Sequence, residues 1–179
     1  MKLMIASDLH GSAYYVNKLL ERLETEQPDK LLLLGDLLYH GPRNDLPRDY
    51  DPKAVLAMLN GVKDRLLCVR GNCDAEVDQM VLEFPILAEY GAVLLEGRTL
   101  YLIHGHKDTN LPLQPGDVLL SGHTHVPVME RRDGINYVNP GSVSIPKQGS
   151  AHGYMVLEGD RVIHKDLGGA VLGDFTFAE

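Results

Sequence analysis

The first third of the chain alternates short apolar blocks with segments that carry one apolar helical face. The apolar blocks have the length of a strand and cover residues 2–7, 30–34 and 65–69. The helical patterns lie between them, at residues 14–23 and 52–59. Strands separated by helices pair in parallel, because parallel pairing needs a long crossover and a helix supplies one. This order therefore predicts a parallel sheet that is buried under helices.

After about residue 84 the pattern changes to strand-like segments that turn signals join in pairs. Three such signals are Glu96-Gly97-Arg98, Asp133-Gly134 and Gly159-Asp160. The first of them joins residues 86–95 to residues 100–103, and tight turns of this kind join antiparallel strands. A parallel first part and a hairpin-rich second part predict two packed sheets with helices outside them. The length and the absence of a linker or repeat predict a single domain over residues 1–179.

The charge balance disfavours one large class of partner. The formal net charge is -8 and no basic stripe is present, so we expect no non-specific binding to nucleic acid. The longest apolar run, residues 31–34, is too short to span a bilayer, and residues 3–6 are too short for a signal-peptide core. We therefore expect a cytoplasmic protein with no membrane segment. A disulfide between Cys68 and Cys73 stays open, but two cysteines do not make the framework of a small secreted domain.

Seven side chains of the metal-ligand type follow apolar runs along the chain. They are Asp8, His10, Asp36, Asn72, His104, His123 and His125. Ligands collect outside the carboxyl ends of parallel strands, so these groups are expected to converge. Gly71 and Gly122 stand directly before two of them, where the missing side chain lets the backbone pass close to an ion. Any one of the seven could be a helix cap or an ordinary polar residue. The joint ordered pattern instead favours a metal site.

The ligand chemistry narrows the choice of ion. Carboxylate, imidazole and amide groups without a thiolate suit manganese, iron or zinc, and imidazoles argue against calcium. Two such ions about 3.5–4 Å apart can clamp a phosphoryl group and generate hydroxide from water at neutral pH. The pattern therefore predicts a binuclear centre for phosphoester hydrolysis.

In this order the residues resemble the calcineurin-like metallophosphoesterase family, whose pattern is D-x-H, G-D, G-N-H-[DE], a lone H and G-H-x-H. The matching blocks are Asp8-Leu9-His10, Gly35-Asp36, Gly71-Asn72, His104-Gly105 and Gly122-His123-Thr124-His125. Three further stretches look like bacterial phosphodiesterases of the YfcE type: His40-Gly41-Pro42-Arg43-Asn44, Arg70-Gly71-Asn72-Cys73-Asp74 and Asn139-Pro140-Gly141-Ser142. The family fold is of the α/β (mixed α+β) class, a four-layer sandwich of two mixed β-sheets flanked by helices. It agrees with the reading of the strand and helix patterns.

The resemblance implies a metal-dependent phosphodiesterase that hydrolyses phosphodiester bonds with a hydroxide activated by a binuclear metal centre. Its ligand sets would be Asp8, His10 and His125 for one ion, Asn72, His104 and His123 for the other, and Asp36 as the bridge. Two divalent ions are expected, with Mn²⁺ first and Zn²⁺, Fe²⁺, Ni²⁺ or Mg²⁺ as alternatives. The implied substrate is a small molecule or an exposed phosphodiester. The implied catalytic residues are Asn72, Cys73, Asp74 and His104.

One residue departs from the family pattern. Many members have a histidine after the asparagine, placed to protonate the leaving oxygen, and this chain has Cys73. A thiol with an ordinary pKa of about 8.5 is a poorer proton donor at neutral pH than imidazolium. We therefore expect a bias towards activated esters such as aryl phosphodiesters. Asp74 could act electrostatically on the same group.

For other residues near these blocks, both a functional and a structural role are compatible with the sequence. Arg43 and Asn44 lie in a Pro/Gly-rich loop and could contact the substrate phosphate, while a structural loop salt bridge fits Arg43 equally well. His40 and His106 flank ligand blocks, where hydrogen bonding to a ligand is at least as good a reading as substrate contact.

Two other functions fit the same fold. One is a phosphomonoesterase or protein phosphatase, although 179 residues leave little room for the grooves of the latter. The other is a non-catalytic scaffold, like the small subunit of the retromer complex, which predicts lost ligands. All seven are present here, and Cys73 alone favours a scaffold. A homo-oligomer is compatible with the sequence, since an exposed edge strand could pair with its copy.

Overall fold

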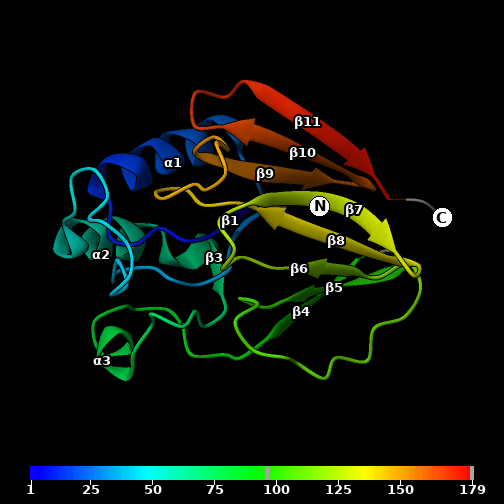
Figure 1. The fold of residues 1–179 in the computed structure, drawn as a ribbon, viewed down its shortest axis with the longest axis horizontal. Helices are drawn as coiled ribbons and strands as arrows, with labels where there is room; N and C mark the ends of the chain where they lie inside the picture. Colours follow the sequence, from blue (N-terminus) through cyan, green and yellow to red (C-terminus); the bar gives the residue numbers. More distant parts are fainter. Residues whose placement is uncertain (96, 178–179) are drawn as a thin grey trace.

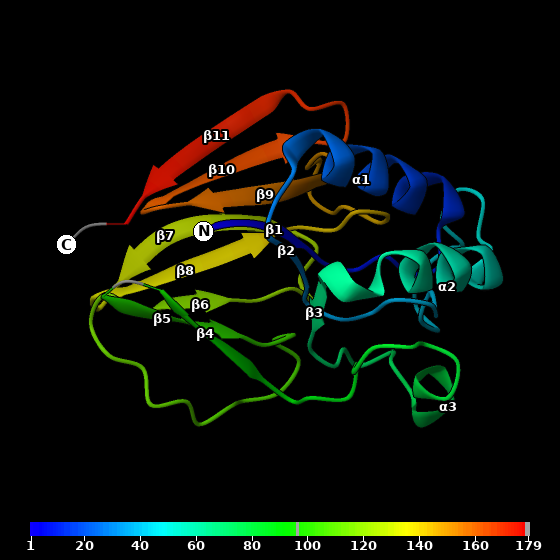
Figure 2. The same ribbon diagram turned by 180° about the vertical axis from the view of Figure 1, so that it is seen from behind.

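Two mixed β-sheets make up the centre of the computed structural model, which describes residues 1–95 and 97–177 (Figure 1). The first sheet has six strands in the order β11 (Val171–Thr176), β10 (Arg161–Asp166), β9 (Gly153–Glu158), β1 (Lys2–Ala6), β2 (Lys30–Leu33) and β3 (Leu66–Cys68). The second has five, in the order β4 (Gly91–Leu95), β5 (Arg98–Leu102), β6 (Val118–Leu120), β8 (Ile135–Pro140) and β7 (Pro127–Arg132). The edge strands β11 and β7 of the two sheets lie side by side (Figures 1 and 2).

The helices begin at side-chain caps that the sequence provides. Ser12 accepts a hydrogen bond from the Tyr15 N–H and starts α1 (Ala13–Glu26), which ends at Gln27 in the left-handed conformation. Asp51 caps α2 (Pro52–Gly61), with Pro52 at its first position. A 3-10 turn (Lys63–Arg65) and the short helix α3 (Glu76–Gln79) complete the helical segments of the described residues.

The strands of the six-stranded sheet bury side chains on both faces. Met4, Ala6, Leu31 and Leu33 pack with α1 and α2, together with Leu82, Phe84 and Ile86 of the segment after α3. Leu3, Ile5, Leu32 and Leu34 face the five-stranded sheet instead. This alternation is what a central sheet requires, and it places the six-stranded sheet between the helices and the five-stranded sheet.

The helices are unevenly distributed between the two sheets. Figures 1 and 2 show α1 and α2 together beside the six-stranded sheet. Among the described residues, no helix longer than one turn covers the outer face of the five-stranded sheet, where Leu94 is 78% exposed. The two mixed sheets with flanking helices agree with the predicted architecture, while the outer helical layer of the four-layer sandwich is not found on this side.

Most predicted elements are present, and the differences have physical causes. The β1-α1-β2 and β2-α2-β3 units pair in parallel, and β4–β5, β7–β8 and β9–β10 are antiparallel hairpins. Glu96 of the first hairpin turn lies outside the described residues. Residues 86–90, which we expected to begin the fourth strand, are not a strand. Ile86 packs instead into the core under the helices. The pairing of β4 with β5 therefore begins only at Gly91.

Three features were not predicted. The strand β11 and the short helix α3 carry weak sequence patterns, and β5, β6 and β8 pair in parallel inside the second sheet. Cys68 and Cys73 are both free thiols. Among residues 1–95 and 97–177, no helix has the length and apolar character that crossing a membrane requires.

Candidate metal centre

Loops that follow parallel strands of both sheets bring the predicted ligands together. Asp8 follows β1, Asp36 follows β2, His104 follows β5 and His123 follows β6. The loops are tied by backbone hydrogen bonds: the Asp8 N–H donates to Gly35 O at 3.1 Å, and the His10 N–H donates to Asp36 O at 2.9 Å. In the other sheet, the Gly122 N–H donates to His104 O at 2.9 Å. The ligand segments therefore form one connected layer at the carboxyl ends of these strands.

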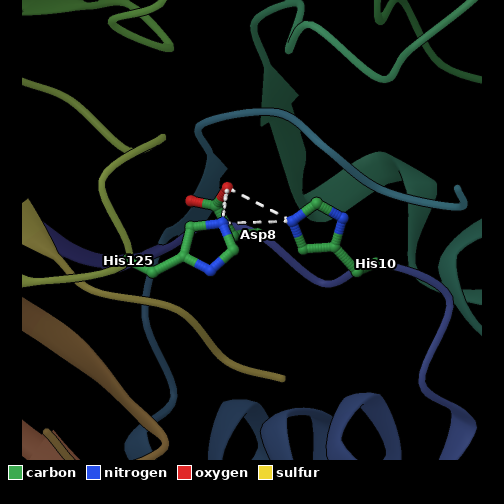
Figure 3. Close-up of side chains that lie close together, drawn as sticks. All are labelled: Asp8, His10 and His125. Carbon is green, nitrogen blue, oxygen red and sulfur yellow. Dashed lines mark hydrogen bonds and ion pairs between the residues drawn. The ribbon is translucent and has the colours of Figure 1, made fainter. Parts of the chain in front are cut away.

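The first ligand set consists of Asp8, His10 and His125, whose side chains point toward one another (Figure 3). Asp8 Oδ1 lies 3.1 Å from His125 Nε2 and 3.5 Å from His10 Nε2, and the two ring nitrogens are 3.2 Å apart. All three residues are buried. The Oδ1 atom of Asp8 is itself buried and has no hydrogen-bond partner among the described residues.

Backbone carbonyls fix which nitrogen of each ring faces the centre. His10 Nδ1 lies 2.8 Å from Tyr39 O, and His125 Nδ1 lies 2.6 Å from Ile145 O. A carbonyl oxygen only accepts, so each Nδ1 carries the proton and each neutral ring presents a lone pair on Nε2. Two lone pairs and a carboxylate oxygen then face one another within 3.5 Å. Such an arrangement needs a cation or a proton between them, and it fits a divalent metal ion.

In the second predicted ligand set, Asn72 Oδ1 and the ring of His123 lie beside His104. His104 Nδ1 donates to Leu34 O at 2.6 Å, so its Nε2 lone pair faces Asn72 Oδ1 at 3.0 Å. The ring of His123 is 5.1 Å from that of His104, centre to centre. Asp36 Oδ2 lies between the sets, 3.7 Å from His10 Nε2 and 3.5 Å from His104 Nε2. The position of Asp36 suits a ligand shared by two ions.

The electrostatics of the cluster fit the same reading. Burial alone would raise the pKa of Asp8, but the adjacent imidazoles of His10 and His125 lower it well below its usual range. Burial likewise opposes the shift of Asp36, whose pKa falls because of His104. The pKa of His104 rises to about 9 against its burial, through the hydrogen bond with Asp36 and the charge of Asp8. The two carboxylates are therefore ionised, while His104 favours its protonated form, and a metal ion on His104 would have to displace that proton.

Most of the predicted ligands adopt a strained backbone conformation. Five of them have positive φ angles between 45° and 66°, and these are Asp8, His10, Asp36, His123 and His125. A residue with a side chain loses roughly 1–2 kcal/mol in this region, so the surrounding contacts must hold it there. The sequence predicts close backbone approach at the neighbouring glycines, and it gives no signal for the positive φ angles of these five residues.

A pocket of about 330 Å³ opens onto this layer. Its walls include Asn72, Cys73, His123, Arg43 and Asn44, so the predicted substrate residues border the same space as the ligands. Burial and the charges of Asp36 and Asp74 raise the pKa of the Cys73 thiol to about 12. His40 and His106 are not among the residues that line this pocket.

Asp74 lies behind the ligands rather than in the pocket wall. Its carboxylate accepts hydrogen bonds from the N–H groups of Asp36, Leu37 and Gly71, at 2.8, 2.8 and 2.7 Å. It thereby ties the loop after β2 to the loop after β3. We interpret Asp74 as a positioning residue for Asp36 and Asn72, not as a group that touches substrate.

Replacing Asp74 by alanine is expected to lower the free energy of unfolding by about 3 kcal/mol, because it leaves buried N–H groups without an acceptor. For a chain of this size the melting temperature would fall by roughly 6–12 °C. Thermal denaturation of the metal-free protein measures this, with the exposed Asp64→Ala as a matched control. A variant that melts within about 1 °C of the parent would rule out the positioning role.

Further residues support the site in ways that the sequence does not predict, although Ser142 belongs to the stretch Asn139-Pro140-Gly141-Ser142 noted above. The Ser7 hydroxyl donates to Asp8 Oδ2 at 2.6 Å and the His123 N–H donates to the same oxygen at 3.0 Å, which leaves Oδ1 to face the centre. Ser142 Oγ donates to Asp8 O at 2.8 Å. Lys147 lines the pocket from a loop about twenty residues beyond the last ligand. Serine next to an aspartate is too common for a signal, and Lys147 carries none.

Known proteins are similar to this chain in both sequence and fold. A family model described as "Calcineurin-like phosphoesterase superfamily domain" matches residues 1–161. The chain belongs to this family. Membership implies divalent metal ions, and the clusters of Asp8, His10 and His125 and of Asp8, Asp36 and His104 are groups that could hold them.

Among individual relatives, Phosphodiesterase YfcE of Escherichia coli (strain K12) is 52% identical over 163 residues, covering 89% of each chain. A solved structure of Yfce, a phosphoesterase from E. coli, superposes with a TM-score of 0.95 at 47% identity, over 99% of this chain and 100% of that one. Wild-type Vps29 of Entamoeba histolytica, solved in complex with Zn²⁺, gives a TM-score of 0.63 at 20% identity, over 99% of this chain and 100% of that one. The Vps29 match shows a shared fold only.

Proposed function

We propose that this chain is a metal-dependent phosphodiesterase, a phosphoric ester hydrolase that cleaves its substrate at a binuclear centre. The observation that carries the proposal is the position of the Asp36 carboxylate between two sets of lone pairs, 3.7 Å from His10 Nε2 and 3.5 Å from His104 Nε2. The 52% identity to Phosphodiesterase YfcE supports a diester rather than a monoester as substrate.

Each group of the chain has a distinct task in this proposal. Two divalent ions, when bound, would lower the pKa of water and stabilise charge on a phosphoryl group. Asp8, His10 and His125 would hold one ion, Asn72, His104 and His123 the other, and Asp36 both. Asn72 and His104 would border the reacting phosphate, and Arg43 and Asn44 would contact the substrate from the pocket wall. Backbone carbonyls at Nδ1 keep the rings of His10, His104 and His125 in the ligand tautomer.

We assign Mn²⁺ as the first candidate ion, with Zn²⁺, Fe²⁺, Ni²⁺ and Mg²⁺ as alternatives, since nitrogen and oxygen ligands suit all of them. The proposal extends to a single catalytic domain over residues 1–179 that acts in the cytoplasm on a small or exposed phosphodiester. Its acidic net charge of -8 supports the absence of non-specific nucleic-acid binding.

Because Cys73 stands where many family members have a histidine, we expect the rate of hydrolysis to depend strongly on the leaving group. A thiol gives up its proton to a leaving oxygen poorly, so esters that release a stable anion, such as aryl diesters, should be cleaved best. Replacing Cys73 by histidine should leave turnover of an alkyl diester unchanged or raise it by up to about 100-fold. Steady-state rates on an alkyl and an aryl diester measure this. A large fall on both esters would mean that the thiol has a role of its own.

The function is tested by hydrolysis of bis(4-nitrophenyl) phosphate and of 4-nitrophenyl phosphate. Metal-stripped protein would be supplied with one ion at a time from the five candidates. We expect no turnover without metal and preferential release of nitrophenolate from the diester when the working ion is restored. A preference for the monoester would identify a phosphomonoesterase. Turnover of neither ester, with metal bound, would favour a non-catalytic scaffold.

A further inference from the structure

We propose that the pocket binds a second anionic group of the substrate, next to the phosphate that is cleaved, between Lys147 and Arg43. This inference rests on the proposed phosphodiesterase function and narrows its substrate class. The favoured substrates are diesters that carry an additional phosphate or carboxylate group. Lys147 would be a specificity-determining residue.

Lys147 and Arg43 are the cationic residues of the pocket wall. Asp36 is the one carboxylate that lines the pocket within residues 1–95 and 97–177, and it belongs to the proposed metal ligands. Neither Lys147 nor Arg43 forms an ion pair with any carboxylate in the described part of the chain. Both are exposed at the mouth of the pocket and are free to meet an anion from outside.

The loop that carries Lys147 is hydrogen-bonded to the predicted ligand His125. His125 Nδ1 donates to Ile145 O at 2.6 Å, and the Lys147 N–H donates to His125 O at 3.1 Å. The Ser150 hydroxyl donates to Lys147 O at 2.7 Å and closes the turn. The contacts that orient His125 therefore also fix the backbone of Lys147 at the pocket.

The loop that carries Arg43 is attached to the neighbouring ligand in the same way. His10 Nδ1 donates to Tyr39 O at 2.8 Å, and the Asn44 side-chain amide donates to His40 O at 2.8 Å. His10 and His125 face each other at 3.2 Å. Both cations thus border the side of the pocket that the first ligand set forms.

The charge of the site exceeds that of a plain diester. Two divalent ions, the Asp8 and Asp36 carboxylates and the activated hydroxide would together leave one positive charge, and Lys147 and Arg43 would raise it to three. A simple phosphodiester brings one negative charge. The chain as a whole is acidic, with 25 acidic and 17 basic residues, yet it leaves these two cations without acidic partners. A second anionic group on the substrate would supply the missing partner.

Two matched substrates test the inference: the 4-nitrophenyl ester of thymidine 5′-phosphate, and the same ester with an added 3′-phosphate. We expect the metal-loaded parent to have a higher kcat/KM for the 3′-phosphorylated ester, with the preference shrinking as salt is raised. Lys147→Met should reduce the ratio of the two kcat/KM values about 3- to 5-fold, and Lys147→Met with Arg43→Ala about 10-fold or more. The exposed Lys53→Met on α2 is the matched control and should leave both values unchanged.

Calorimetry provides a readout that does not need catalysis. Thymidine 3′,5′-bisphosphate should bind the metal-loaded parent more tightly than thymidine 5′-monophosphate, and Lys147→Met should reduce this difference. No preference in the parent, or an equal loss on both substrates in Lys147→Met, would overturn the inference. If neither ester is cleaved but the bisphosphate still binds more tightly through Lys147, the anion subsite stands and the proposed function fails.

Discussion

Asp36→Asn is expected to lower diester turnover by at least about 1000-fold, equivalent to roughly 4 kcal/mol of transition-state stabilisation. The variant keeps the shape of the side chain but removes the charge that lies between His10 and His104. One amide oxygen cannot replace a carboxylate shared by two ions. The amide nitrogen would also have to sit where a metal or the Cys73 N–H now requires an acceptor.

Metal content and turnover should be measured together on the same preparation. We expect Asp36→Asn to lose at least one of two bound ions at metal concentrations that saturate the parent. Asp64→Asn, at an exposed aspartate whose side chain makes no hydrogen bond within the described residues, should match the parent in both measurements. Full metal occupancy with full activity in Asp36→Asn would contradict the bridging assignment.

Gly71→Ala is the second large effect, and it is steric. A Cβ atom at Gly71 would lie 2.0 Å from Asp36 Oδ1 and 2.3 Å from the Asp36 N atom. Backbone cannot move away cheaply, so Asp36 itself would have to shift. A displacement of about 1 Å at a reacting site can cost about 100-fold in rate. We therefore expect a loss of turnover of about 100-fold or more and weaker metal binding.

The chain offers a matched glycine for comparison. At Gly61, the last residue of α2, an added Cβ would meet no atom within 4 Å, and its φ angle is not positive. Gly61→Ala should retain turnover and stabilise the fold by about 0.5–1 kcal/mol, as alanine does in a helix. If Gly71→Ala and Gly61→Ala behave alike in turnover and metal content, the close packing of Gly71 on Asp36 has no functional consequence.

The first half of the fold could be predicted because local pattern and tertiary environment agree there. After an initial lysine, the blocks that became β1 and β2 are apolar, as buried parallel strands must be, and one apolar helical face marks each of α1 and α2. The prediction of a strand at residues 86–90 was wrong because local pattern and tertiary environment disagree there. Their apolar character serves the helical core through Ile86, and a hydrophobic pattern alone does not say which layer a side chain joins.

The predicted ligands could be recognised because their residue types recur after apolar strands. The hydrogen bonds that orient these side chains could not be predicted. The carbonyls that orient His10 and His125 belong to Tyr39 and Ile145, whose side chains carry no signal for that task. Asp74 is predicted to act electrostatically on the reaction, and the three backbone N–H groups that its side chain accepts could not be anticipated. Such contacts depend on the path of two loops in space, which residue types do not encode individually.

The central claim is that two ions share Asp36, and an anomalous difference map of crystals grown with Mn²⁺ tests it most directly. We predict two peaks about 3.5–4 Å apart. One should lie among Asp8, His10 and His125, the other among Asn72, His104 and His123, with Asp36 contacting both. A single peak, or two peaks of which only one contacts Asp36, would contradict the binuclear account.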